Sequence, residues 1–296
     1  YTVDGLGNLT QQTSPDTGTS TSTYDTAGNL LTRTDAKGQV ASYAYDALNR
    51  VTSITFHDGS KQTYAYDQGA NGIGRLTQVT ETDPAKQVTN QIAYAYDQKG
   101  RVLTETRTVS GVAYVNAYSY DSAGRLSGMT YPSGRTVTYS FDALGRIAGV
   151  TTAKDGNTKT VVSNVAYQPF GGVKSFGYGN GQTYTRQYDQ DGRIAAYTLG
   201  ATQFNLGFDA ASRIGFIAEN GNAANTNNYG YDALDRLTQA MLPATGFGYG
   251  YDAVGNRLTK TTGANTDSYT YGATSNRLVS IAPASGPARS FAFDAN

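Results

Sequence analysis

The sequence predicts an all-β protein: tandem antiparallel β-hairpin repeats in one long curved sheet that coils into a spiral, β-solenoid-like shell. Two observations carry this prediction. A motif made of an aromatic residue, Asp, a short loop and Arg recurs along almost the whole chain of 296 residues. Aromatic and small residues alternate before each Asp with the period of two that is typical of strands, and nothing recurs at the helical period of 3.6.

The repeat is clear at residues 45–50 (YDALNR) and 120–125 (YDSAGR), and successive copies begin 20 to 30 residues apart, mostly 20 to 24. Such repetition is typical of proteins in which each unit contacts only its neighbours, so we expect residues 1–296 to be a single array of roughly eleven to twelve hairpin units, a fragment of a longer shell. The repeat residues expected to be structural are Tyr24, Asp25, Tyr45, Asp46, Arg50, Tyr66, Asp67, Arg75, Tyr96, Asp97, Arg101, Tyr120, Asp121, Arg125, Phe141, Asp142, Arg146, Tyr188, Asp189, Arg193, Phe208, Asp209, Arg213, Tyr231, Asp232, Arg236, Tyr251, Asp252 and Arg257.

The first strand of each unit ends in an aromatic–small–aromatic triplet, such as residues 43–45 (YAY) and 229–231 (YGY). The period of two places both rings on one face of the sheet and the small residue on the other. We expect the tyrosines to stack in ladders across strands. The alternative, that exposed Tyr rows bind sugars or partner proteins, stays open.

The loop between Asp and Arg has three residues in most copies, the length of a type I turn followed by one residue in the left-handed conformation. The third loop residue is usually Gly, which adopts that conformation freely. Asn49 tolerates it, Ser212 is expected to be mildly strained, and Gly171 is expected to occupy it in a degenerate copy. The copies that begin at residues 251 and 271 are expected to have four-residue loops, and the copy at residue 66 a loop of seven.

A second strand follows each Arg, as in residues 51–56, and a further tight turn, such as Asp58-Gly59, leads to the next aromatic pair. The Thr- and Ser-rich segment 11–23 is expected to be one such connection, with its turn at residues 14–16. About 24 strands spaced by ~4.8 Å would make a sheet about 115 Å wide. A twisted sheet of this width has to curl, split or flatten, and coiling lets one turn of a spiral cover the edge of the next.

The Asp and Arg of the motif could in principle act as a catalytic carboxylate and an anion-binding partner. A pair repeated in about ten copies is instead expected to be structural, because a catalytic site needs one special copy. We expect each Asp to accept hydrogen bonds from its own turn amides. His57, the only His, is expected to be a solvated turn residue, and Asp189 with Asp191 resembles a calcium loop only faintly because a later acidic ligand is missing. No enzymatic activity, cofactor or metal is predicted.

Composition narrows the function classes further. The chain carries 23 basic and 23 acidic residues, so no net charge favours binding to nucleic acid. It has no Cys, which excludes a disulfide framework and thiolate metal sites. No apolar run approaches the ~20 residues that span a membrane as a helix.

The motif Tyr-Asp-x-x-Gly-Arg-Leu, as in residues 120–126, resembles the YD repeat of the Rhs family, and the resemblance covers essentially Tyr24 to Asp294. That family includes bacterial Rhs polymorphic toxins, the cocoon subunits of insecticidal toxin complexes and animal teneurins. The resemblance implies a spiral of hairpins that forms a hollow shell on a secreted or cell-surface protein. In bacterial relatives the shell holds a toxic C-terminal domain until delivery, and in teneurins it serves adhesion. The resemblance also implies a self-cleaving motif around Asp-Pro near the end of a bacterial shell. The only Asp-Pro pair here, Asp83-Pro84, lies in the middle of the array, so that motif and the toxin are expected outside this chain.

Our first hypothesis is therefore a structural shell segment that encloses and protects a toxin or effector cargo for delivery, with a C-terminal toxin domain as its partner. The alternative is an adhesive or filament-forming cell-surface repeat protein that associates with itself, with glycans or with partner proteins. A glycan-processing enzyme is a third and weaker alternative.

Overall fold

The computed structural model describes residues 1–85, 88–169 and 171–295, and these residues form antiparallel β-strands joined by tight turns. The one helical element among them is a single 3₁₀ turn, η1 (Ala223–Asn225). The predicted fold class, all-β with tandem antiparallel hairpins, is therefore confirmed. The strands are β1 (Thr2–Val3), β2 (Leu9–Ser14), β3 (Gly18–Tyr24), β4 (Leu30–Thr34), β5 (Val40–Tyr45), β6 (Val51–Thr55), β7 (Lys61–Tyr66), β8 (Leu76–Asp83), β9 (Val88–Tyr96), β10 (Val102–Val109), β11 (Val112–Tyr120), β12 (Leu126–Thr130), β13 (Thr136–Phe141), β14 (Ile147–Lys154), β15 (Asn157–Tyr167), β16 (Val173–Tyr178), β17 (Thr183–Tyr188), β18 (Ile194–Leu199), β19 (Thr202–Phe208), β20 (Ile214–Glu219), β21 (Thr226–Tyr231), β22 (Leu237–Met241), β23 (Gly246–Tyr251), β24 (Arg257–Thr262), β25 (Asn265–Tyr271), β26 (Leu278–Ala282) and β27 (Arg289–Ser290).

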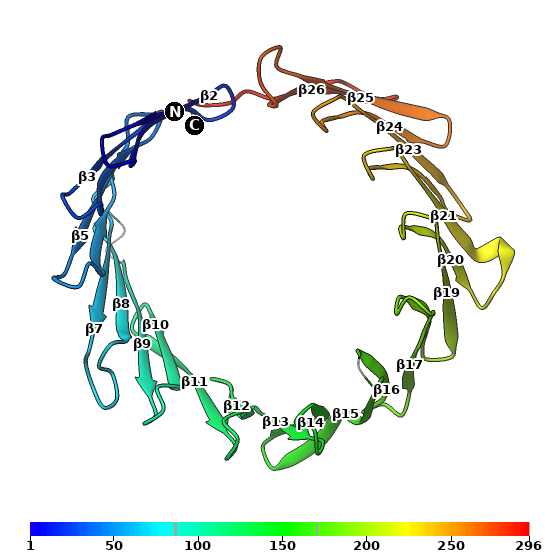
Figure 1. The fold of residues 1–296 in the computed structure, drawn as a ribbon, viewed down its shortest axis with the longest axis horizontal. Helices are drawn as coiled ribbons and strands as arrows, with labels where there is room; N and C mark the ends of the chain where they lie inside the picture. Colours follow the sequence, from blue (N-terminus) through cyan, green and yellow to red (C-terminus); the bar gives the residue numbers. More distant parts are fainter. Residues whose placement is uncertain (86–87, 170, 296) are drawn as a thin grey trace. The chain divides into compact units, whose positions relative to one another are not determined.

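The chain divides into two compact units. The first contains residues 1–139, 152–158 and the last residues from Phe293, and the second contains residues 140–151 and 159–292. In the first unit each strand from β1 to β12 pairs antiparallel with the next strand in the chain, which gives a meander in sequence order (Figure 1). The second unit repeats this order from β15 to β27.

The motif hairpins whose register the structure describes carry a bulge at the same place. In the hairpin of β5 and β6, Tyr45 pairs with Val51 but Ala44 pairs with Ser53, so Thr52 is left without a partner across the strands. The same shift lies between the aromatic residue of the motif and the residue before it in the hairpins β3–β4, β7–β8, β19–β20 and β25–β26, among others. A bulge increases the local twist of a strand pair, so its recurrence gives every unit the same bend.

The two faces of the sheet differ in chemistry. Tyr43 pairs with Ile54 across the strands. Both side chains lie on the same side of the sheet as Tyr45 and Tyr64, and we call this side the aromatic face. The opposite side, the hydroxyl face, holds Thr, Ser and Ala; it includes the side-chain pair Thr23–Thr32, whose hydroxyl oxygens lie 2.6 Å apart. This division confirms the predicted alternation of aromatic and small residues.

Very little of either unit is buried. Among the described residues other than Gly, the buried side chains are those of Thr77, Tyr184, Ala196, Ala218, Ala240 and Ile281. Because no second layer of described residues covers the sheet within either unit, the stability of each unit has to come from contacts between neighbouring strands. Several kinds of contact between neighbouring hairpins lie at the motif turns.

Candidate functional site: a Tyr–Asp–Arg ladder

Each motif turn is organised by its Asp. In the turn at Asp46, one carboxylate oxygen accepts hydrogen bonds from the backbone N–H groups of Leu48 (2.9 Å) and Arg50 (3.0 Å). The N–H of Asn49 donates to the carbonyl of Asp46, and the N–H of Asp46 donates to the carbonyl of Arg50. These bonds close the predicted three-residue loop, with Asn49 in the left-handed region at φ 60°.

The second carboxylate oxygen of the Asp binds the Arg that follows the loop. Arg50 Nε donates to Asp46 Oδ2 at 2.7 Å. The same Nε–Oδ2 bond recurs at 2.6–2.8 Å between Asp97 and Arg101, Asp121 and Arg125, Asp142 and Arg146, Asp189 and Arg193, Asp209 and Arg213, and Asp232 and Arg236. The Asp therefore fixes both the turn and the direction in which the guanidinium points.

The tyrosine of the motif links each hairpin to the one before it. Its hydroxyl donates to the backbone carbonyl of the residue that follows the Arg position in the preceding motif turn. This bond joins Tyr24 to Leu9, Tyr45 to Leu30, Tyr66 to Val51, Tyr96 to Leu76, Tyr120 to Val102, Tyr167 to Ile147, Tyr188 to Val173, Tyr231 to Ile214, Tyr251 to Leu237 and Tyr271 to Arg257, with O···O distances of 2.5–3.2 Å. Because that carbonyl lies beside the bulge, the bond also satisfies an acceptor that the sheet ladder leaves open.

The Arg links each hairpin to the one after it. Its guanidinium carbon lies over the aromatic ring of the next motif, 4.4 Å from the ring centre for Arg50 and Tyr66. The same stacking, at 4.3–5.7 Å, joins Arg75 to Tyr96, Arg101 to Tyr120, Arg146 to Tyr167, Arg193 to Phe208, Arg213 to Tyr231 and Arg236 to Tyr251. Hydroxyl bond, ion pair and stacked guanidinium together form what we call the Tyr–Asp–Arg ladder.

Polar side chains at the left-handed loop position add a further link. Arg193 Nη1 donates to Ser212 Oγ at 2.8 Å, and Arg213 Nη1 donates to Asp235 Oδ1 at 2.7 Å. Ser212 has φ 63°, so the strain expected there is confirmed, and the hydrogen bond from the preceding hairpin compensates for it. The side chains of Ser212 and Asp235 thus join neighbouring turns, whereas a Gly at the same position has no side chain to accept this hydrogen bond.

The turn hydrogen bonds also set the ionisation of the aspartates. The pKa of the Asp46 carboxyl lies below its ordinary value of 3.8, chiefly because the backbone N–H of Arg50 donates to it. The pKa values of Asp142 and Asp209 are lowered for the same chief reason, by the N–H groups of Arg146 and Arg213. The carboxylates are therefore charged at neutral pH, as the ion pairs with Arg require.

Two copies of the motif do not form the Asp–Arg pair within their own turn. After Asp252 the loop has three residues, because Gly255 takes the left-handed position at φ 99° and Asn256, not Arg257, follows it. Asn256 Nδ2 donates to Asp252 Oδ2 at 2.9 Å, and Arg257 instead lies 4.4 Å over the ring of Tyr269. The four-residue loop predicted at this copy is thereby corrected as well.

The second copy without an Asp–Arg pair in its own turn is the one with the long loop after Asp67. Arg75 donates to the backbone carbonyls of Asn71 and Ile73, because the four extra residues fold back under its guanidinium. The Asp67 carboxylate accepts instead from Arg50 of the preceding hairpin (2.6 Å) and from the N–H of Gly74. The pair is therefore made between hairpins rather than within one.

The remaining repeat residues lie in the positions that the motif predicts. Phe141 and Phe208 occupy the Tyr position, but without a hydroxyl they cannot make the bond to the preceding hairpin. The four-residue loop at residue 271 is confirmed, since the N–H of Gly272 bonds to the carbonyl of Arg277. The expectation for Gly171 depends on the peptide from residue 170, which lies outside the described residues.

Sequence reasoning missed the copy of the motif at Asp4, and it missed that Asn can take the place of Arg. Asp4 and Asn8 form the same turn, with Asn8 Nδ2 donating to Asp4 Oδ2 at 2.9 Å, and Asn29 does the same for Asp25. Asp35 builds a similar turn at the other ends of the strands by accepting from the N–H groups of Lys37 and Gln39. The sequence pattern that identifies these turns is Asp, then Gly three residues later, then a residue with an amide or guanidinium side chain directly after the Gly.

Ring-to-ring stacking, which we expected along the whole array, is concentrated in one group of the second unit. Phe176 stacks on Tyr184 with ring centres 4.8 Å apart, and Tyr197 stacks on Phe204 at 5.1 Å. Tyr178 meets the edge of Phe176, and Tyr184 lies 6.4 Å from Tyr197. Because the stacked rings cover one another's faces, this group offers ring edges rather than open ring faces to a sugar.

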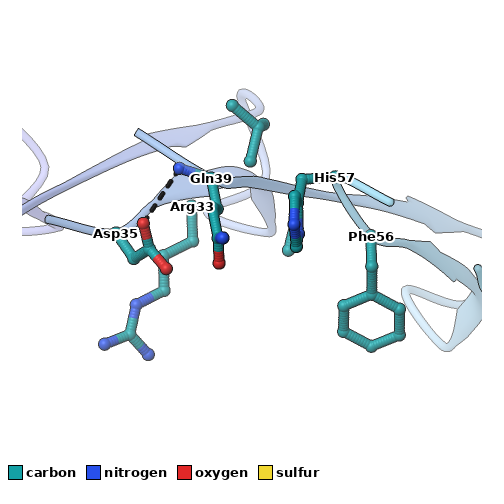
Figure 2. Close-up of a pocket in the computed structure, with 7 residues that line it drawn as sticks. Arg33, Asp35, Gln39, Phe56 and His57 are labelled. Atoms are coloured by element: carbon teal, nitrogen blue, oxygen red, sulfur yellow. Dashed lines mark hydrogen bonds between the residues drawn. The ribbon is translucent and has the colours of Figure 1, made fainter. Parts of the chain in front are cut away.

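His57 lies beside a shallow hollow of the first unit, with Phe56, Arg33, Asp35 and Gln39 around it (Figure 2). The Asp35 carboxylate is engaged by the N–H of Gln39 at 2.9 Å, and His57 itself is exposed in its turn, as predicted. Asp189 and Asp191, the faint calcium motif, both bind Arg193. Within residues 1–85, 88–169 and 171–295 no group of three metal-ligating side chains converges. Nor does the described part of the chain contain a helix with the length and apolarity to cross a membrane.

These features define an all-β repeat protein whose hairpins are coupled side by side by the Tyr–Asp–Arg ladder. The family model of the RHS Repeat matches residues 3–40, 24–61, 45–83 and 120–158, so these segments of the chain are RHS repeats, as their motif implied. A sequence comparison with curated proteins gives no match.

Solved structures share this fold at low sequence identity. The crystal structure of TcdB2-TccC3 superposes with a TM-score of 0.80 at 16% identity, over 92% of this chain and 17% of that chain. The Tc holotoxin pore of Photorhabdus luminescens superposes with a TM-score of 0.78 at 16% identity, over 93% of this chain and 16% of that chain. The chain thus spans about a sixth of the length of these relatives.

Proposed function

We propose that the chain is a wall segment of a shell that encloses a toxin or effector cargo and protects it until delivery. The Tyr–Asp–Arg ladder carries this proposal, because it binds neighbouring hairpins to one another and so makes a barrier from a sheet only one layer thick. The RHS repeats and the similarity in fold to TcdB2-TccC3 and to a Tc holotoxin support the same reading.

The mechanism is steric. A wall of hydrogen-bonded strands has no opening along its ladders, so it separates an enclosed polypeptide from proteases and from folded partners. Under this proposal residues 1–296 act as one array, the 29 predicted repeat residues hold it together, and no residue acts catalytically. A secreted location follows from the delivery role.

One observation favours the alternative of an adhesive or filament-forming surface protein. The second loop residue of several motif turns is an exposed aliphatic side chain: Leu6, Leu48, Leu144, Leu234 and Val254 are 66–76% exposed. Exposed apolar side chains at successive strand ends can bind a partner or a second copy of the chain.

Electron microscopy of the protein with its natural flanking segments tests the proposal. A closed wall around additional density, in particles of one size, is the expected result. Extended fibres that lengthen with protein concentration would overturn it in favour of self-association. Binding to glycans or to a partner protein by particles with an empty interior would likewise replace the shell with the adhesive function.

A further inference from the structure

A hollow on the aromatic face of the first unit gathers polar side chains that the Tyr–Asp–Arg ladder does not use. It has a volume of about 300 Å³ and is lined by Gln62, Val79, Glu81, Asn90, Gln91, Ile92, Arg107 and Val109. These residues come from the four consecutive strands β7, β8, β9 and β10. The hollow therefore lies on a surface that the paired strands themselves hold rigid.

The strand register arranges the lining in two rows across the sheet. In the first row Gln62 pairs with Glu81 and Glu81 with Asn90. In the second row Val79 pairs with Ile92 and Ile92 with Arg107. The carboxylate of Glu81 and the guanidinium of Arg107 thus stand at diagonal corners, roughly 12 Å apart at the backbone, with the aliphatic side chains of the second row between them.

Several polar groups of the hollow have no partner within the described chain. The side-chain oxygen of Asn90 is buried and accepts no hydrogen bond there. Glu81 and Arg107 form neither an ion pair nor a side-chain hydrogen bond with any residue that the structure describes. The side-chain oxygen of Gln62 accepts from the hydroxyl of Tyr64 at 2.9 Å, which turns the Gln62 amide NH₂ toward other acceptors. A buried oxygen without a donor is unfavourable, so a ligand that donates to Asn90 would be stabilised.

We propose that this hollow binds a ligand that carries a cationic nitrogen and a carboxylate joined by an aliphatic chain. Arg107 pairs with the carboxylate, Glu81 and the Asn90 oxygen accept from the nitrogen, and Val79 and Ile92 contact the methylene groups. A free amino acid such as lysine has this chemistry, and so does a polypeptide segment with a basic and an acidic side chain close together.

Calorimetric titration of the intact chain with 6-aminohexanoate tests the binding. We expect saturable binding in the millimolar range, and binding about tenfold weaker by hexanoate and by hexylammonium, each of which lacks one charge. Arg107→Gln and Glu81→Gln are each expected to weaken binding of 6-aminohexanoate about tenfold. Arg33→Gln is the matched control, because Arg33 lies on the same face, pairs with Ala41 across the strands and does not line the hollow.

Free lysine and an end-capped Lys-Gly-Asp peptide, titrated in parallel, distinguish the two sources of the ligand. Tighter binding of the peptide assigns the hollow to a polypeptide, and tighter binding of lysine assigns it to a free amino acid. The proposal is overturned if none of these probes gives saturable binding, or if the Arg107 and Glu81 variants bind as well as the Arg33 variant. Circular dichroism of each variant shows whether the sheet is intact.

Discussion

At the scale of single residues, the tyrosine hydroxyl has the clearest separate role. Replacing Tyr45 by Phe keeps the ring under the preceding hairpin but removes the bond to the carbonyl of Leu30 (2.9 Å). We expect the free energy of unfolding to fall by about 1 kcal/mol, because a partly buried carbonyl loses its donor. Urea denaturation monitored by circular dichroism measures this change.

The control for that variant lies two residues away. Tyr43→Phe removes a hydroxyl that donates to no described residue, from the same strand and the same face, so we expect little change. The reverse change, Phe208→Tyr, places a hydroxyl where the carbonyl of Ile194 is expected to accept it, and should stabilise the chain. Equal effects of Tyr45→Phe and Tyr43→Phe would show that the hydroxyl bond contributes nothing.

The aspartates predict how stability depends on pH. The pKa values of Asp46, Asp142 and Asp209 are lowered in the folded chain from an ordinary 3.8. A lowered pKa means that the stabilisation is fully present above about pH 3.8 and is lost as the pH falls through the folded-state value. We expect the urea midpoint to be steady between pH 7 and pH 5 and to drop steeply below pH 4.

The variant Asp46→Asn checks the cause of that drop. It keeps an oxygen for the turn amides but removes the charge that binds Arg50. Its midpoint should be lower than that of the unchanged chain at pH 7, and the difference should shrink toward pH 3. A constant difference across this range would mean that the charge of Asp46 does not contribute.

At the scale of the hairpin, the left-handed loop position explains which glycines can be replaced. Gly100 and Gly192 occupy equivalent positions and both have φ 78°. A methyl group at Gly192 would meet open space, whereas one at Gly100 would overlap the guanidinium of Arg75. We expect Gly192→Ala to cost about 1–2 kcal/mol from the backbone alone, and Gly100→Ala to cost more.

Thermal unfolding of the two variants measures this difference. Because the backbone angle is the same, any excess cost at Gly100 reports on the side chain of Arg75 alone. That side chain is held by the carbonyls of Asn71 and Ile73 and by the ring of Tyr96, which limits its retreat. Identical costs for Gly100→Ala and Gly192→Ala would show that Arg75 moves away freely.

The sequence predicted the hairpin well because its signals are local. Alternation of Tyr43, Ala44 and Tyr45 and a left-handed Asn49 follow from strand geometry and turn chemistry within a few residues. The hydroxyl bond from Tyr45 to Leu30 crosses 15 residues and depends on the bulge, which no single residue type announces. The misassigned Arg257 has the same origin, because Gly255 rather than the spacing to the nearest Arg decides where the loop closes.

The hollow around Asn90 and Arg107 also lay beyond prediction. Its residues lie up to 47 positions apart in the sequence, from Gln62 to Val109, and only the register of β7 to β10 brings them together. Charged residues on strands are usually solvated, so neither Glu81 nor Arg107 stood out in the sequence.

At the scale of the molecule, stability depends on coupling between neighbouring hairpins. A single-layer array with few buried side chains is stabilised by nearest-neighbour contacts, so damage at one link should spread to the adjoining unit and fade beyond it. The bond from the hydroxyl of Tyr231 to the carbonyl of Ile214 (3.0 Å) is one such link between the hairpins β19–β20 and β21–β22.

Hydrogen–deuterium exchange of Tyr231→Phe, read by mass spectrometry, tests this coupling directly. We expect faster exchange of backbone amides in both β19–β20 and β21–β22, with exchange in β2 to β5 unchanged. Faster exchange confined to β21–β22, or no change in either hairpin, would contradict it.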